Sequence, residues 1–116
     1  MKKFLALTFD LEIFPWLRKR NFEKALKNSK IGFLNLVEWI ESLKGSFTFF
    51  VNGEFANRWP KIFDLITSNV EIASHGFSHP FKFYSLKKVK GDVEKITRLL
   101  NSYGIEPKGY RFPNMQ

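Results

Sequence analysis

The chain has 116 residues, enough for one small domain with a single core, and its hydrophobic fraction of 44% argues against global disorder. It contains no cysteine, which excludes disulfides, thiolate metal sites and a cysteine nucleophile. The 19 basic and 11 acidic side chains give a net charge of +8, and such a balance favours anionic partners. Basic side chains crowd residues 18–30 and 82–90. We interpret them as a solvated surface, and we do not expect nucleic acid as a partner because no recognised nucleic-acid motif is present.

The start of the sequence predicts neither export nor membrane insertion. Two lysines precede a short apolar run, residues 4–9, which Asp10 closes. This run is shorter than the apolar region of a signal peptide. No stretch approaches the roughly 18 apolar residues of a transmembrane helix. We therefore expect a cytoplasmic protein.

The first part of the chain predicts a strand followed by a helix. Residues 4–9 are apolar and ended by charge, as in a buried strand. Residues 11–30 are basic and irregular, with helical character expected only over residues 21–27. Apolar side chains then recur at helical spacing over residues 33–43, and Gly45 supplies a C-terminal stop.

Two further strands flank a short helix in the middle of the chain. Residues 46–51 are β-rich and apolar at odd and even positions alike, as in a strand covered on both faces. Asn52-Gly53 predicts a turn, and Pro60 is expected to open a short helix. Residues 70–73 form the third predicted strand.

The last part of the chain predicts one long helix and a fourth strand. Ser85 is the expected N-cap of a helix that runs to about Tyr103, and Gly104 ends it. Residues 109–112 then predict a short strand. The order β-α-β-α-β-α-β is typical of a parallel sheet covered by helices, so the predicted fold class is α/β.

Charged and polar side chains follow or end several of the predicted strands. In chain order they are Asp10, Glu12, His75, His79 and Arg111. Carboxyl ends of parallel strands share one edge of a sheet, where α/β proteins place their sites. Two histidines four residues apart and one carboxylate are the ligand set of an open catalytic zinc site. Taken separately, these residues also fit an acidic turn and ordinary surface histidines, and their shared position at one edge favours a site.

Four short strings occur in a characteristic order. They read Leu-Thr-Phe-Asp at residues 7–10, Thr-Phe-Phe-Val at 48–51, Glu-Ile-Ala-Ser-His-Gly-Phe-Ser-His at 71–79 and Tyr-Arg-Phe-Pro at 110–113. Each string alone is a weak signal, but the ordered set resembles the polysaccharide deacetylase family (NodB homology, carbohydrate esterase family 4). The resemblance covers nearly all of residues 1–116, taken as one domain, and corresponds to the first half or so of the family's domain.

The resemblance implies both a fold and an activity. The fold is a distorted, partly open (β/α) barrel, and the reaction is hydrolysis of N-acetyl or related non-peptide carbon–nitrogen bonds, with an N-acetylated carbohydrate as partner. His75 and His79 would bind a divalent metal ion, usually zinc. Asp10 would be the general base, and Arg111 would hold Asp10 ionised and oriented. This chemistry is reasonable because a metal lowers the pKa of its bound water, from which a nearby carboxylate can remove a proton.

The sequence departs from the family in its first motif. The commonest form has two adjacent aspartates, whereas this chain has Asp10-Leu11-Glu12. We assign Glu12 as the third metal ligand, although Asp10 and Glu12 could exchange roles. Pro113 and Asn114 are assigned to substrate binding, because the backbone after Pro113 would help to stabilise the oxyanion.

A second departure is that the sequence stops at Gln116, just past the third motif. The family's later motifs, which carry an aspartate, an aromatic groove residue and a catalytic-acid histidine, are not in it. His75 and His79 are its only histidines, so neither is left as a general acid. We therefore expect a fragment, a truncated reading frame, or a half-barrel that dimerises to close its edge.

Two other functions compete with a metal-dependent deacetylase. One is a non-catalytic, metal-containing remnant that binds a glycan or an anion. Its stacking surfaces for sugar rings would be Trp16, Trp59, Phe81, Phe83 and Tyr84. The other is a nucleic-acid binder, which rests on charge alone and is ranked last.

Overall fold

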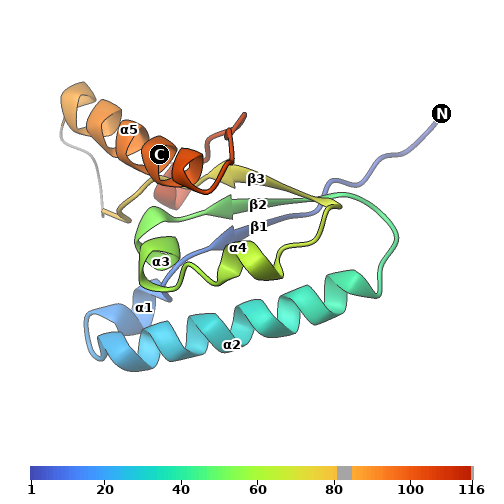
Figure 1. Cartoon of the computed structure of the whole chain (residues 1–116), viewed down its shortest axis with the longest axis horizontal. Coiled ribbons are helices and arrows are strands. Elements are labelled where there is room, and N and C mark those ends of the chain that lie inside the picture. The colour runs from blue at the N-terminus through green and yellow to red at the C-terminus, as the bar shows by residue number, and fades with distance from the viewer. Residues whose placement is uncertain (81–84, 116) are drawn as a thin grey trace.

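The computed structural model describes residues 1–80 and 85–115. Figure 1 shows a central sheet with the long helices α2 and α5 on opposite sides of it. Among the residues singled out from the sequence, those outside the described part of the chain are Phe81, Lys82, Phe83 and Tyr84.

The sheet is parallel and has three strands in the order β1-β2-β3. The strands are β1 (Thr8–Leu11), β2 (Phe47–Val51) and β3 (Val70–Ser74). The register places Thr8 of β1 opposite Thr48 of β2. Because the strands run in the same direction, their carboxyl ends lie at one edge of the sheet, as the alternation of strands and helices predicts.

The first strand begins later than the sequence predicts. Residues 4–9 were expected to form it, but Phe4 is 90% exposed and Leu5 is 83% exposed. Pairing sets the boundary, because the Thr48 N–H of β2 donates to the carbonyl oxygen of Leu7 at 3.3 Å. The apolar run begins several residues before the part of the chain that can pair with β2, so the predicted start of the strand was wrong.

One long helix replaces much of the irregular segment expected over residues 11–30. α1 (Pro15–Arg18) is a single turn, and α2 (Phe22–Glu41) has 20 residues. The Asn21 side chain caps α2 by accepting from the Lys24 N–H at 3.0 Å. The buried residues of α2 are Ala25, Leu26, Phe33, Val37 and Ile40. Largely exposed polar residues in the middle of α2 interrupt the apolar pattern without interrupting the helix, so the prediction of two separate helical pieces was wrong.

The core between α2 and the sheet is largely aromatic. Phe49 of β2 is fully buried, and its ring meets that of Phe33 edge to face at 6.2 Å. Trp59 packs against Phe33 at 5.6 Å, so its ring belongs to the core rather than to a surface for sugar stacking. On the opposite face of β2, Thr48 and Phe50 are only half-buried, so that face is less covered than the sequence predicts.

A helix, rather than the predicted turn, follows β2. Asn52 is the N-cap of α3 (Gly53–Arg58), and its Oδ1 accepts from the Phe55 N–H at 3.2 Å. The prediction was wrong because asparagine is favoured at helix N-caps as well as in turns. Pro60 then precedes α4 (Ile62–Leu65) by two positions, so the expected short helix is present but begins later.

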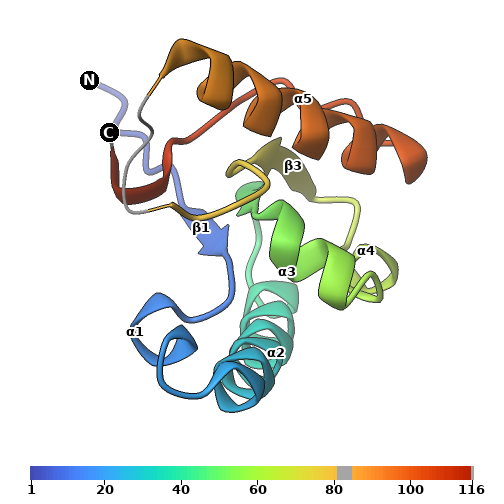
Figure 2. The same ribbon diagram turned by 90° about the vertical axis from the view of Figure 1, so that its left-hand side faces the viewer.

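α5 (Leu86–Ser102) lies on the other side of the sheet from α2, which the rotated view also shows (Figure 2). Its N-cap is Ser85, as predicted, and the Ser85 side chain accepts from the Lys88 N–H at 3.3 Å. Gly104, with a φ of +75°, follows the end of the helix as expected.

The predicted fourth strand, residues 109–112, is reduced to a single bridge between Ser74 and Tyr110. The Arg111 N–H donates to the Ser74 carbonyl oxygen at 2.9 Å. Pairing stops there because Ser74 is the last residue of β3, so the strand assignment was wrong although the segment lies beside the sheet. This short contact nevertheless fixes Arg111 at the carboxyl end of β3.

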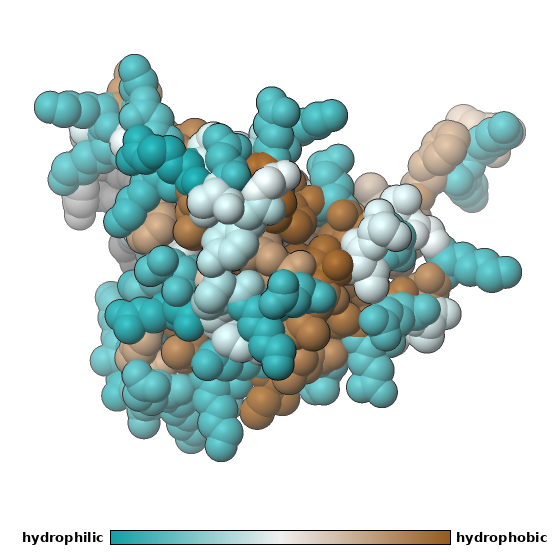
Figure 3. Space-filling model, in the orientation of Figure 1, coloured by the Kyte–Doolittle hydropathy of each residue, from teal (hydrophilic) through white to brown (hydrophobic). Residues whose placement is uncertain are grey.

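One face of the molecule is mostly hydrophilic, in agreement with the charge. Figure 3 shows hydrophilic side chains over most of one face, with a band of hydrophobic ones across its middle.

Among residues 1–80 and 85–115, no helix combines the length and the apolar character needed to cross a membrane.

The core makes a prediction about stability. Replacing fully buried Phe49 by alanine should lower the free energy of unfolding by about 3–5 kcal/mol, because it leaves a cavity among packed rings. Leu34→Ala is the matched control, since Leu34 is 46% exposed on α2 and its loss should change stability by less than about 0.5 kcal/mol. Urea unfolding followed by circular dichroism measures both, and equal losses would contradict this placement of the core.

Candidate active site

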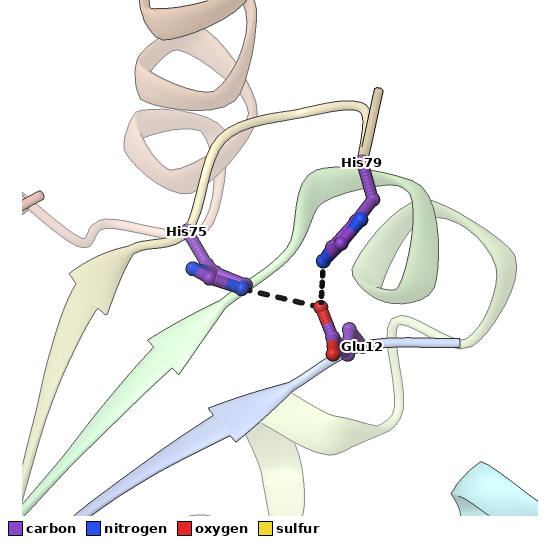
Figure 4. Close-up of side chains that lie close together, drawn as sticks. All are labelled: Glu12, His75 and His79. Atoms are coloured by element: carbon purple, nitrogen blue, oxygen red, sulfur yellow. Dashed lines mark hydrogen bonds and ion pairs between the residues drawn. The ribbon is translucent and has the colours of Figure 1, made fainter. Parts of the chain in front are cut away.

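Glu12, His75 and His79 bring three potential metal ligands together. Glu12 follows β1, His75 follows β3 directly, and His79 lies four residues further along the same loop. One ligand atom from each residue lies within 4.8 Å of the other two. Figure 4 shows both imidazoles directed at the Glu12 carboxylate. The structure thus brings a carboxylate close to a pair of histidines, although Glu12 lies more than sixty positions before both histidines in the sequence.

His75 is held from behind by the backbone. Its side chain is only 2% exposed, and its Nδ1 lies 2.9 Å from the carbonyl oxygen of Arg111. A carbonyl oxygen only accepts hydrogen bonds, so Nδ1 carries the proton and Nε2 is the atom turned toward Glu12. This arrangement is typical of metal-binding histidines, whose second nitrogen donates to a fixed acceptor.

Glu12 dominates the electrostatics of the cluster. Its Oε2 lies 2.8 Å from His79 Nε2 and 3.2 Å from His75 Nε2. Burial opposes ionisation of Glu12, but hydrogen bonds to the two histidines and their charges outweigh it and lower the pKa of Glu12 to about 2. The hydrogen bond to Glu12 likewise raises the pKa of His79 above its usual 6.5, against the effect of burial. In the metal-free protein, a proton on His79 therefore joins His79 Nε2 to Glu12 Oε2, two atoms that could both bind a cation.

Asp10 and Arg111 form a second pair beside the cluster. Arg111 Nη1 donates to Asp10 Oδ1 at 2.7 Å, and Nη2 donates to Thr8 Oγ1 at 2.7 Å. The guanidinium also lies over the ring of Phe50, 4.0 Å from its centroid. Asp10 Oδ2 is 3.8 Å from His75 Nε2, so this carboxylate adjoins the cluster without entering it.

The loop between the two histidines has supports that the sequence did not reveal. The Gly53 N–H at the start of α3 donates to the Gly76 carbonyl oxygen at 2.8 Å. On the other side, the Asp92 carboxylate of α5 accepts from the N–H groups of Phe77 and Ser78, both at 2.9 Å. The sequence carries no signal for Asp92, which lies on a helix with an ordinary pattern of charged residues. The start of α3 does have a signal, the Asn-Gly pair directly after a strand, but this pair also predicts a turn.

Pro113 and Asn114, assigned to substrate binding from the sequence, lie at different depths. Pro113 is buried at the start of the short 3-10 helix η1 (Pro113–Met115). Asn114 is exposed, has a φ of +58° and donates from Nδ2 to the Pro80 carbonyl oxygen at 3.4 Å. The Asn114 side chain lines the same cavity as the cluster.

A cavity of about 1160 Å³ opens beside the cluster. Its wall includes the turn between β1 and α2, where Trp16 is 85% exposed and Phe14 is 49% exposed. Arg18 also lines the cavity and pairs with Glu54 at 2.6 Å. Of the stacking candidates within the described residues, Trp16 is therefore the one that faces open space.

Comparisons with known proteins identify related folds. The family model for polysaccharide deacetylase matches residues 1–116. A protein assigned as a polysaccharide deacetylase from Mycobacterium smegmatis has a similar structure, with a TM-score of 0.78 and 25% identity over 94% of this chain and 42% of that one. Among curated proteins, no sequence matches this chain.

Two further solved structures differ in function from one another. A carbohydrate esterase family 4 pseudoenzyme from Bacillus anthracis has a TM-score of 0.71 at 16% identity, over 96% of this chain and 35% of that one. A family 4 acetyl xylan esterase from Clostridium thermocellum, solved with a cobalt ion, has a TM-score of 0.59 at 22% identity, over 96% and 49%. This chain spans less than half the length of each of these neighbours. The predicted fold class, α/β with part of a (β/α) barrel, is confirmed.

The coupled charges of Glu12 and His79 predict how stability depends on pH in the metal-free protein. The lowered pKa of Glu12 stabilises the fold above pH 4.5, and this contribution is lost as the pH falls toward about 2. The raised pKa of His79 stabilises the fold below pH 6.5, and this contribution is lost as the pH rises through the folded-state value. Urea midpoints measured with a chelator present should therefore be highest between about pH 4.5 and 6.5, and Glu12→Gln should flatten this maximum. A wild-type midpoint that still rises above pH 7 would contradict the coupling.

Proposed function

Because the chain belongs to the polysaccharide deacetylase family, we propose that it is a metal-dependent hydrolase that removes N-acetyl groups from a carbohydrate. The observation that carries this proposal is the meeting of Glu12, His75 and His79 within 4.8 Å. Membership in the family supports the class of reaction, and the donor set supports the cation.

A divalent cation, zinc in our proposal, fits these donors. Two imidazole nitrogens and one carboxylate oxygen leave a fourth position open for water or substrate. His75 is already oriented for this role by the Arg111 carbonyl oxygen at 2.9 Å. When bound, such a cation lowers the pKa of water and polarises the carbonyl oxygen of an acetamide. The cobalt ion in the Clostridium thermocellum esterase supports a divalent cation in this fold.

Asp10 is the proposed general base, and Glu12 the proposed ligand. Glu12 contacts both histidines, at 2.8 and 3.2 Å, whereas Asp10 lies 3.8 Å from His75 and is oriented by Arg111. Of the two assignments that the sequence left open, this geometry favours Glu12 as the ligand and Asp10 as the base. Asp10 would take a proton from the attacking water and return it to the leaving nitrogen as the carbon–nitrogen bond breaks. Within residues 1–116 both histidines are assigned to the cation, so Asp10 is the group that we propose to carry the proton.

Asn114 and Pro113 are proposed to contact the substrate. Asn114 lines the cavity that holds the cluster, and Pro113 fixes the backbone immediately before it. A backbone N–H after Pro113 would stabilise the negative charge that develops on the acetamide oxygen.

A non-catalytic binding protein is the second candidate. Its support is Trp16, which is 85% exposed at the cavity and could stack on a sugar ring. This candidate predicts affinity for an N-acetylated oligosaccharide that Trp16→Ala weakens, without release of acetate. Acetate release by the wild-type chain would exclude it.

The base makes a prediction about turnover. Asp10→Asn should lower acetate release from an N-acetylglucosamine oligomer by about 10²–10⁴-fold, because the amide cannot take a proton, while zinc content is unchanged. Asp64→Asn is the matched control, since Asp64 is exposed on α4 and its variant should keep full turnover. Acetate release and mass spectrometry of the metal measure both effects. Wild-type turnover in Asp10→Asn would reject the assigned role.

The ligands make a prediction about metal content. The purified chain should bind about one zinc ion, and a His75→Ala, His79→Ala variant should bind none. Zinc affinity should fall as the pH is lowered below the raised pKa of His79, because a proton then competes with the metal for Nε2. Chelator competition from pH 5 to 8 measures this slope. A pH-independent affinity would exclude His79 as a ligand.

A further inference from the structure

The three residues between the histidines are held from two sides. From α3, the Gly53 N–H donates to the Gly76 carbonyl oxygen and the Glu54 N–H donates to the Phe77 carbonyl oxygen, both at 2.8 Å. These two bonds satisfy carbonyl oxygens of the loop. The N–H groups of the loop need other acceptors.

Asp92 of α5 supplies acceptors for two of those N–H groups. Its Oδ2 accepts from the Phe77 N–H at 2.9 Å, and its Oδ1 accepts from the Ser78 N–H at 2.9 Å and from Ser78 Oγ at 2.6 Å. Hydrogen bonds to an ionised carboxylate are stronger than those between neutral groups. Asp92 therefore holds the middle of the loop against α5 with both of its oxygen atoms.

Gly76 makes this approach possible. It has a φ of +76°, and a Cβ atom there would lie 2.7 Å from Asp92 Oδ2 and 3.2 Å from the Tyr110 hydroxyl. A side chain at this position would push the loop and Asp92 apart. Because Gly76 has no side chain, the loop and the Asp92 carboxylate of α5 can approach each other closely.

We propose that Asp92 is a positioning residue that sets the metal affinity of His75 and His79. Because the two histidines flank the residues that Asp92 binds, their separation and the direction of each imidazole depend on where that loop segment lies. Asp92 touches neither imidazole in the structure and acts through Phe77 and Ser78. The proposal rests on the metal site of the proposed function.

The test compares cobalt affinity with fold stability. Asp92→Asn keeps the shape of the side chain but turns an NH₂ group toward an N–H donor, and it should weaken the binding of Co²⁺ by about 10–100-fold and change its visible spectrum. Glu94→Gln is the matched control on the same helix, since its side chain is 52% exposed and pairs only loosely with Lys90 at 3.8 Å; it should bind Co²⁺ as the wild type does.

A second control separates positioning from general loss of stability. Leu100→Ala should destabilise α5, because Leu100 is fully buried, but folded protein should keep wild-type affinity for Co²⁺. If Asp92→Asn does not fold, Ser78→Ala decides, since it removes only the Oγ bond and should weaken Co²⁺ binding several-fold. Wild-type affinity in Asp92→Asn, or in Ser78→Ala where that variant decides, would overturn the proposal and leave the proposed function standing. No Co²⁺ binding by the wild-type chain would instead reject the metal site itself.

Discussion

The parallel pairing of β1, β2 and β3 is the constraint on which the site depends. Strands that share one direction deliver the residues that follow them to the same edge of the sheet. With Leu11 opposite Val51, and Val51 opposite Ser74, the next residues along β1 and β3 are Glu12 and His75. A register shift of one residue in β1 would turn its side chains to the other face of the sheet and remove the carboxylate from the cluster.

Arg111 connects His75 with Asp10 at that edge. Its carbonyl oxygen accepts from His75, while its guanidinium binds Asp10 and Thr8 and stacks on Phe50. One residue thus orients both a proposed metal ligand and the proposed base. Because backbone and side chain move together, the geometry of the ligand and that of the base cannot be adjusted independently.

The sequence predicts those parts of the molecule that depend on local pattern. Glu12 and His75 could be singled out because each follows an apolar run, and the order of strands and helices places such ends together. Leu5 shows the limit, since its apolar character predicts a strand that the neighbouring β2 is too short to pair with. Asn52 was recognised, but its role as a cap depends on the helix that follows it. Asp92 could not be found, because its importance comes from a loop that only the tertiary fold brings to it.

The contacts that build this site close very long loops of chain. Glu12 and His75 are 63 positions apart, and Thr8 and Arg111 are 103 positions apart. The entropy of closing such loops is lost before the contacts contribute, so folds of this kind assemble slowly. A folding intermediate in which β1 has not yet joined β3 would carry both histidines without the carboxylate. Where the joining of β1 is the last step, a cation that needs all three ligands binds only to the native state, so it slows unfolding without accelerating folding.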